Sequence, residues 1–235
     1  MPDVLDLQEY SLHLPQDFPP LPRRYGYRIA YEGEEPWNNT PIFYNPETVE
    51  LVDVNYVLYA PSCWSNIGSK SYTSAGFRKK DTGRLFAVVN THLWWKSEAA
   101  QPGSTYARAA QVRLMMAEAE VLKNKYGCTI FVTGDMNAYE DSLPIRQFIE
   151  GGYTPCYKAA TDATDNGNGH HICGPKDGYS RTSRRRSPDR EKGAIDHCFI
   201  YNAQEGVAVK VFDCITARIT VKLTDHYPYL IDAAL

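Results

Sequence analysis

Short apolar runs rich in β-branched and aromatic residues alternate along the chain with turn residues. These runs predict strands over residues 4–10, 40–46, 49–59, 84–95, 129–137, 194–202 and 207–217. Between two of them, apolar residues recur at helical spacing, which predicts a helix over residues 104–126 with Gly127 as its C-cap. A shorter helix is predicted over residues 143–150, before Gly151 and Gly152.

The order of these elements indicates the fold class. The strand over residues 84–95, the helix over 104–126 and the strand that starts at 129 form a crossover unit, which joins parallel strands. The other strands follow one another closely enough for hairpins, so we expect an α/β fold with mixed sheets. Residues 61–69 and 161–192 are rich in Gly, Pro and Asn and are predicted to be long surface loops.

Composition narrows the class of protein. With 43% hydrophobic and 23% charged residues among 235, the chain has the make-up of one globular domain, not of a disordered, collagen-like or coiled-coil protein. Its net charge of −3 gives no general attraction to nucleic acid or to an anionic membrane. No apolar run approaches the roughly 20 residues that a spanning helix needs. We therefore expect no membrane span. We also expect a monomer, although the sequence carries no direct sign of the oligomeric state.

The cysteines form no metal or dithiol motif, because no pair has the spacing C-x-x-C. Cys128, Cys198 and Cys214 lie in apolar strand-like runs, which predicts buried thiols. Cys156 and Cys173 flank a polar loop and are either free or joined by a disulfide. The sequence leaves this choice open.

Polar residues with useful chemistry stand where the predicted strands end. Each has a plain structural explanation when taken alone, such as a turn for Asp135-x-Asn137 or a buried hydrogen bond for a histidine. Strand ends of a layered α/β protein meet at one rim, however, so together they predict a single oxygen-rich site suited to Mg²⁺ or Mn²⁺. The set is Glu9, Asn90, His92, Asp135, Asn137, Asp196, Asp225 and His226.

Five short motifs in this order, LQE, NTHL, GDMNA, IDHCF and TDHYP, resemble those of the endonuclease/exonuclease/phosphatase superfamily, which includes deoxyribonuclease I-like nucleases. The resemblance runs from Glu9 to His226. It implies a four-layer α/β/β/α sandwich of two mixed β-sheets flanked by helices, with the site at one end of the sheets. It also implies hydrolysis of a phosphoester with Mg²⁺ or Mn²⁺ as cofactor.

The resemblance assigns roles to both ends of the site. Glu9 and Asp225 resemble metal ligands of the superfamily. Asp135 and Asn137 resemble the pair that positions the attacking water and contacts the phosphate.

The histidines are matched in the same way. His226 resembles the catalytic histidine and Asp196 the carboxylate that orients it, since an aspartate partner fixes the tautomer of an imidazole. His92 resembles the second histidine, which contacts the phosphate and assists the leaving group. His197 is interpreted as structural.

Residues beside these motifs are candidates for substrate binding. Arg108 resembles the arginine of an A-R-x-x-Q pattern and either faces the phosphate or lies on the helix surface; Tyr106 stands next to it. Of Trp94 and Trp95, one is expected in the core, and Trp94 is the candidate to stack on a sugar or base. The arginine-rich residues 181–193 form either a solvated loop or a phosphate-binding flap.

One part of the superfamily pattern has no counterpart. The resemblance implies a strand that ends in a metal-binding Asn, then a helix, before the motif glutamate, whereas here Met1 stands directly before VLDLQE. We therefore expect the single domain, residues 1–235, to be N-terminally incomplete by roughly 25 to 40 residues. Lower stability and weaker metal binding than in a longer form are expected.

The expected function is hydrolysis of a phosphodiester by a nuclease-like or related enzyme. The substrate class stays open among nucleic acid, lipid and small phosphate esters. Two alternatives are a phosphomonoesterase that acts on a sugar or inositol phosphate, and a catalytically impaired remnant that acts as a binding module. The sequence does not indicate where in or outside the cell the protein works.

Overall fold

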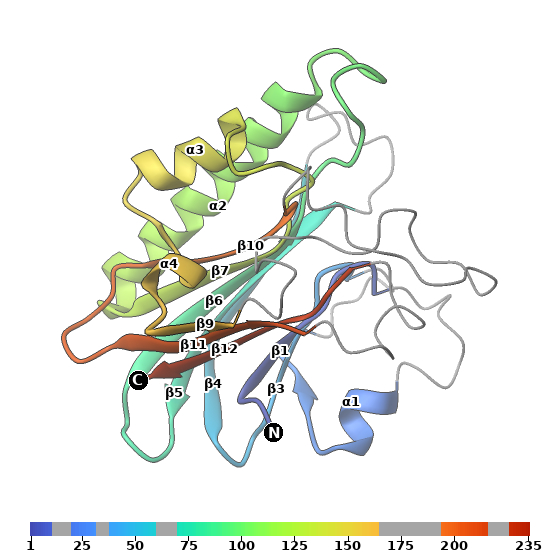
Figure 1. Ribbon diagram of the computed structural model, residues 1–235. Coiled ribbons are helices and arrows are strands. Elements are labelled where there is room, and N and C mark those ends of the chain that lie inside the picture. Colours follow the sequence, from blue (N-terminus) through green and yellow to red (C-terminus); the bar gives the residue numbers. More distant parts are fainter. Residues whose placement is uncertain (11–19, 32–37, 60–69, 165–193, 216–225) are drawn as a thin grey trace.

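The computed structural model of the chain describes residues 1–10, 20–31, 38–59, 70–164, 194–215 and 226–235 (Figure 1). At its centre is a six-stranded sheet in the order β4-β5-β6-β7-β10-β8. Only β6 and β7 are parallel, so the sheet is mixed. The strands are β4 Val49–Leu58, β5 Ser71–Lys79, β6 Leu85–His92, β7 Thr129–Asp135, β8 Thr154–Pro155 and β10 Asp196–Tyr201.

Helices cover one face of this sheet, as Figure 1 shows. The parallel pair β6 and β7 needs a crossover, which α2, Ser104–Tyr126, supplies; α3, Leu143–Glu150, packs beside it. Gly127 ends α2 in the left-handed region with φ 59°, and its N–H donates to the Lys123 carbonyl over 2.7 Å. Both predicted helices are confirmed with their boundaries. The core of this face is fully buried: Val89, Leu93, Met115, Ile130, Ile145 and Phe148.

Two small sheets pack on the opposite face. One has the order β1-β3-β2 and the other β12-β11-β9. Phe77, Phe131 and Phe212 lie in the core between them and the large sheet. The strands are β1 Val4–Asp6, β2 Arg28–Ile29, β3 Ile42–Tyr44, β9 Asp162–Thr164, β11 Ala208–Cys214 and β12 Tyr229–Ala234.

The predicted α/β sandwich is confirmed. The second sheet layer is divided into two separate three-stranded sheets, with β1 at an edge of one and β12 at an edge of the other. Two further short helices are α1, Pro20–Arg24, and α4, Cys156–Ala159. No helix in the described ranges is long and apolar enough to cross a membrane.

Several elements differ from the sequence prediction. The first strand ends at Asp6 instead of residue 10, since Glu9 adopts the left-handed region with φ 56°. Strands β5 and β12 were not predicted, because SYTSAGFRK is largely polar and YLIDAA does not alternate. Strand β9 lies inside the predicted loop over residues 161–192, most of which falls outside the described residues, as residues 61–69 do.

Four cysteines in the described ranges have buried thiols. Cys128, Cys198 and Cys214 confirm the sequence prediction. Cys156 is free and fully buried, and burial raises the pKa of its thiol. Its proposed disulfide partner, Cys173, lies outside the described residues.

Candidate active site

Strand register places the predicted site residues in a row along one rim of the large sheet. His92 is aligned with Asp135 on the parallel strand β7, and Asp135 is aligned with Asp196 on antiparallel β10. On the other side, Ser71 is aligned with His92, which brings Lys70 to the same rim. Strands that are far apart in sequence thus end next to one another.

The same residues project from one face of the sheet. Thr133, two residues before Asp135, donates to Asp6 on β1 over 2.6 Å. Alternate side chains of a strand lie on the same face, so Asp135 also faces the divided sheet layer. Likewise the Asn90 side chain, two residues before His92, donates to the carbonyl of Leu7 over 2.8 Å. The site therefore opens between the two sheet layers, where the segment after β1 delivers Glu9.

Gly134 precedes Asp135 because no other residue fits. Its φ is +139°, and a Cβ added there would stand 2.0 Å from the carbonyl oxygen of Thr91 on the neighbouring strand. This contact is to the backbone, which cannot move aside without breaking the sheet. The glycine of the GDMNA motif therefore allows β6 and β7 to approach where His92 and Asp135 end their strands.

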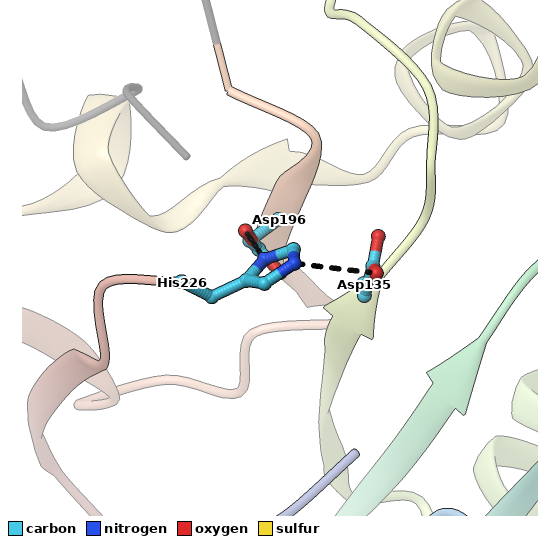
Figure 2. Close-up of side chains that lie close together, drawn as sticks. All are labelled: Asp135, Asp196 and His226. Carbon is cyan, nitrogen blue, oxygen red and sulfur yellow. Dashed lines mark hydrogen bonds and ion pairs between the residues drawn. The ribbon is translucent and has the colours of Figure 1, made fainter. Parts of the chain in front are cut away.

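His226 lies between two carboxylates, as Figure 2 shows. Its Nδ1 donates to Asp196 Oδ2 over 2.6 Å, and its Nε2 stands 3.9 Å from Asp135 Oδ2. The His226 side chain is 34% exposed, whereas those of Asp196 and Asp135 are 12% and 9% exposed. A nearly buried carboxylate thus fixes one ring nitrogen and turns the other toward Asp135.

His92 lies on the other side of Asp135 in a more buried setting. Its Nε2 is 3.3 Å from Asp135 Oδ2 and is also bonded to the Lys70 ammonium. Its Nδ1 is 3.1 Å from Asn39 Oδ1. Because the ring is held at both nitrogens and only 2% of the side chain is exposed, its orientation is fixed.

The carboxylates respond to these neighbours in opposite directions. Burial by itself raises the pKa of Asp135, but His92, His226 and the backbone N–H of Asn137 together hold it below the ordinary value. Burial raises the pKa of Asp196; His226 opposes this rise and the negative charge of Asp135 adds to it. Asp135 is therefore the carboxylate that stays ionised at the centre of the site.

Lys70 is the main site residue that sequence reasoning missed. It is 6% exposed, and burial lowers the pKa of its ammonium to about 8, while the charges of Asp135 and Glu9 act in the other direction. In the sequence Lys70 is only a basic residue before β5, and that strand was itself not predicted, so little points to it. The structure shows it as a cation placed among the carboxylates and the imidazole.

Asn137 shapes the turn that follows β7. It adopts a φ of 47°, its N–H donates to Asp135 Oδ1 over 2.8 Å, and its side-chain amide donates to the Leu93 carbonyl over 3.2 Å. The turn that its residue type predicted is therefore real, and it also brings the amide beside the carboxylate. Asn137 ties β7 to the loop after His92.

Glu9 reaches the rim through contacts of its neighbours. Asn90 accepts a 2.7 Å hydrogen bond from the Gln8 side chain and donates to Leu7 and Pro41 carbonyls, which fastens this segment to β6. The Glu9 carboxylate itself is 76% exposed and lies 3.9 Å from His92 Nε2. An exposed carboxylate at this place is open to a ligand.

The three predicted substrate-binding residues are placed differently from one another. Arg108 is buried, and its Nη1 donates to the backbone carbonyls of Trp94 over 3.1 Å and Lys96 over 2.7 Å. Trp94 is also buried, at 5% exposure, whereas Trp95 is 57% exposed. Tyr106, in the first turn of α2, is 71% exposed. Arg108 therefore contacts backbone here, and the exposed tryptophan is Trp95.

One cluster in the described residues has donor atoms close enough to hold a metal ion. Asp135, Asp196 and His226 each offer a ligand atom within 4.8 Å of the others, but the hydrogen bond between Asp196 and His226 already occupies Nδ1. Carboxylate oxygens of Asp135 and Glu9 both approach His92 Nε2, and Mg²⁺ prefers such oxygens. Asp225 and residues 181–193 lie outside the described residues.

His197 has a structural contact. It is buried, and its Nε2 lies 2.7 Å from the Ala138 carbonyl, with the ring stacked near Phe199. This agrees with its interpretation from the sequence.

Comparison by sequence gives a short match. No family model matches the chain. The RNA exonuclease NGL1 of Saccharomyces cerevisiae is 31% identical over 83 residues, which cover 32% of this chain and 21% of the yeast protein. The match thus spans about a fifth of that relative's length.

Comparison by structure covers nearly the whole chain. A mannosyl-6-phosphatase of Bacteroides thetaiotaomicron has a TM-score of 0.71 at 19% identity, over 99% of this chain and 85% of that one. An endonuclease/exonuclease/phosphatase protein of Bacteroides vulgatus has a TM-score of 0.70 at 22% identity, with 99% and 85% covered. TDP2 of D. rerio, complexed with a single-strand DNA product, has a TM-score of 0.65 at 16% identity, with 100% and 86% covered. The chain therefore has the fold of the endonuclease/exonuclease/phosphatase superfamily, as its motifs predicted.

Proposed function

We propose that the chain hydrolyses phosphodiester bonds with Mg²⁺ or Mn²⁺. The observation that carries this proposal is the His226 imidazole held between Asp196 and Asp135 on a rim that also gathers His92 and Lys70. A phosphodiester resists attack because its anionic oxygens repel a nucleophile, so cationic and hydrogen-bonding groups at those oxygens lower the barrier. The rim supplies both kinds of group.

The carboxylate and amide of the GDMNA motif would orient the attacking water. Asp135 stays ionised and Asn137 is held two residues away by its bond to the same carboxylate, so a water at Asp135 meets an acceptor and an amide together. His226 is oriented by Asp196 and would transfer protons through Nε2, the nitrogen that faces Asp135.

Lys70 would contact the phosphate, and His92 would hold its ammonium in place. The Lys70 ammonium is the buried cation nearest to the imidazole, and it is positioned without reorganisation because the ring is fixed at both nitrogens. A fixed positive charge in a water-poor setting stabilises the extra negative charge of a pentavalent transition state. These two residues thus form the electrostatic side of the site.

Glu9 and Asp135, with Asp225, would hold the divalent cation. When bound, such an ion acts as a Lewis acid toward a phosphoryl oxygen and lowers the pKa of coordinated water. The exposed Glu9 carboxylate is 3.9 Å from His92 Nε2, so a cation held there would lie beside the phosphate contacts.

A phosphomonoesterase is the second candidate, favoured by the similarity to a protein described as a mannosyl-6-phosphatase. The substrates of a phosphomonoesterase and of a phosphodiesterase differ in the net charge of the phosphate group. The impaired-remnant alternative predicts neither activity nor metal binding.

A substrate screen with a matched control separates these functions. Bis-p-nitrophenyl phosphate, p-nitrophenyl phosphate, DNA, RNA, sphingomyelin and inositol phosphates would be offered with Mg²⁺ and with EDTA. We expect Mg²⁺-dependent turnover of diesters that is lost in Asp196→Asn and retained in Asp81→Asn, an exposed carboxylate on the turn at the far end of β5 and β6. Turnover in EDTA, or preference for monoesters, would contradict the proposal.

A further inference from the structure

The loop between β6 and α2 is held by hydrogen bonds on both sides of Trp95. Arg108 Nη1 donates to the carbonyls of the residues before and after it, Trp94 and Lys96. The Trp94 N–H donates to Gln111 Oε1 over 3.0 Å, and its indole Nε1 donates to Ser104 Oγ over 3.2 Å. The A-R-x-x-Q pattern therefore contacts the backbone of this loop with both of its polar side chains.

The two neighbouring tryptophans have different surroundings. Trp94 is anchored in the interior by its indole and its backbone, whereas the adjacent Trp95 is 57% exposed. A single exposed apolar residue is ordinary on a protein surface. A large aromatic side chain is a better binding surface when the backbone on both sides of it is fixed. A ligand that binds to it then orders few further groups of the protein.

Trp95 lies close along the chain to the site residues of the rim. It stands three positions after His92 in the sequence, so their Cα atoms are within about 11 Å. Leu93, between them, is tied to the site, since its N–H donates to the Asp135 carbonyl over 2.9 Å and its carbonyl accepts from Asn137. An aromatic face thus stands one short chain segment away from the phosphate contacts.

The neighbours of Trp95 favour a polar aromatic ligand over a lipid. Lys96 Nζ lies over the rings of Trp94 and Trp95, 5.7 Å from each ring centre, which places a cation against the exposed indole. Ser97 and Glu98 follow, and Glu98 accepts the N–H groups of Gly103 and Thr105. Loops that insert into membranes expose several apolar residues together, whereas this one exposes one ring among polar and charged groups.

We propose that Trp95 is a stacking platform for the base of a nucleotide adjacent to the scissile phosphate, with Lys96 beside that nucleotide's phosphate. The inference rests on the proposed phosphodiesterase function and narrows it to nucleotide substrates. Arg108 and Gln111 are positioning residues for this platform. Base stacking on an aromatic side chain is tolerant of sequence, so the platform selects for a base and not for which base.

Kinetics with a matched pair of substrates tests the platform. The pair is a dinucleotide and its analogue that lacks the base next to the scissile phosphate, each with Mg²⁺. We expect Trp95→Ala to raise KM for the dinucleotide by roughly tenfold with kcat within about twofold, and to leave KM for the abasic analogue unchanged. Trp95→Phe should restore most of the affinity, and Tyr25→Ala, an exposed aromatic by α1, should have no effect.

Equal losses on both substrates, or no change in KM, would overturn the platform while leaving the phosphodiesterase function intact. Calorimetric binding of the same pair in EDTA gives a readout that does not need turnover. Preference for the base-containing ligand that disappears in Trp95→Ala supports the platform even if hydrolysis fails. Trp95-dependent binding to phosphatidylcholine and sphingomyelin vesicles in its place would overturn it.

Discussion

The two imidazoles beside Asp135 are held by different partners. His226 gives its Nδ1 to a carboxylate, Asp196, and its side chain is 34% exposed. His92 is 2% exposed and lies between the Asn39 amide and the Lys70 ammonium. A carboxylate partner stabilises an imidazolium as it forms, so the accessible His226 suits proton transfer. A ring fixed by an amide and an ammonium suits a positioning task, since His92 holds the Lys70 ammonium, the group that can contact an anion.

Replacing Asp196 by Asn should have the largest effect. The amide cannot stabilise an imidazolium, and it favours the wrong tautomer, so we expect kcat on bis-p-nitrophenyl phosphate to fall by about 10²- to 10⁴-fold with little change in KM. Steady-state kinetics with Mg²⁺ measure this, with Asp81→Asn as the matched control. A loss of kcat below tenfold would mean that His226 is not the residue that transfers the proton.

Replacing Lys70 by Met should separate activity from stability. Loss of the cation should lower kcat/KM by about 100-fold. The pKa of Lys70 falls from 10.5 to about 8 on folding, so its burial opposes folding below pH 8 and the penalty disappears as the pH rises toward 10.5. We therefore expect the variant to be up to about 3 kcal/mol more stable at pH 7.

Denaturant unfolding at pH 7 and pH 10 checks the stability effect of Lys70→Met, with Lys80→Met, an exposed lysine of the β5–β6 turn, as control. The gain should shrink at pH 10. A variant that is both inactive and less stable at pH 7 would show that Lys70 serves the fold and not the site.

Replacing Asp6 by Asn tests the layer beneath the site. Its Oδ2 accepts from Thr133, its Oδ1 is buried without a partner in the described structure, and burial raises the pKa to about 6. The raised value favours folding at low pH, so wild type should lose stability as pH rises from about 4 to 6, by about 1 to 2 kcal/mol because the residue keeps some exposure. The Asn variant should lack this slope in unfolding curves and keep its kcat.

Replacing Asn39 by Ala should have the smallest effect. It removes one of the two contacts that orient His92, but Lys70 still holds the other nitrogen. We expect kcat/KM to fall by about three- to tenfold. A loss as large as that of Asp196→Asn would contradict the division of tasks between the two histidines.

Much of this site follows from sequence because its residues sit in short motifs at strand ends. The histidines and carboxylates of NTHL, GDMNA and IDHCF could be placed on one rim without knowing the register, since β6 and β7 end there and the antiparallel β10 begins there. Gly134 shows why the motif is strict, as a side chain at this position meets the backbone of β6.

The partners of these residues could not be predicted in the same way. Lys70 and Asn39 reach His92 from a strand start and a loop, and their contacts depend on a register that polar β5 does not reveal. The sequence did not show which of Trp94 and Trp95 is buried, because β6 ends at His92 and the alternation of side chains no longer applies after it. Arg108, matched to a phosphate contact, is engaged by loop carbonyls that no pattern shows.

The most direct test of the account compares kcat/KM of wild type, Asp196→Asn and Asn39→Ala on bis-p-nitrophenyl phosphate over a Mg²⁺ titration. We predict turnover that requires Mg²⁺, and a loss at Asp196 at least about tenfold larger than the loss at Asn39. Turnover by wild type that is independent of the metal, or equal losses in the two variants, would contradict it.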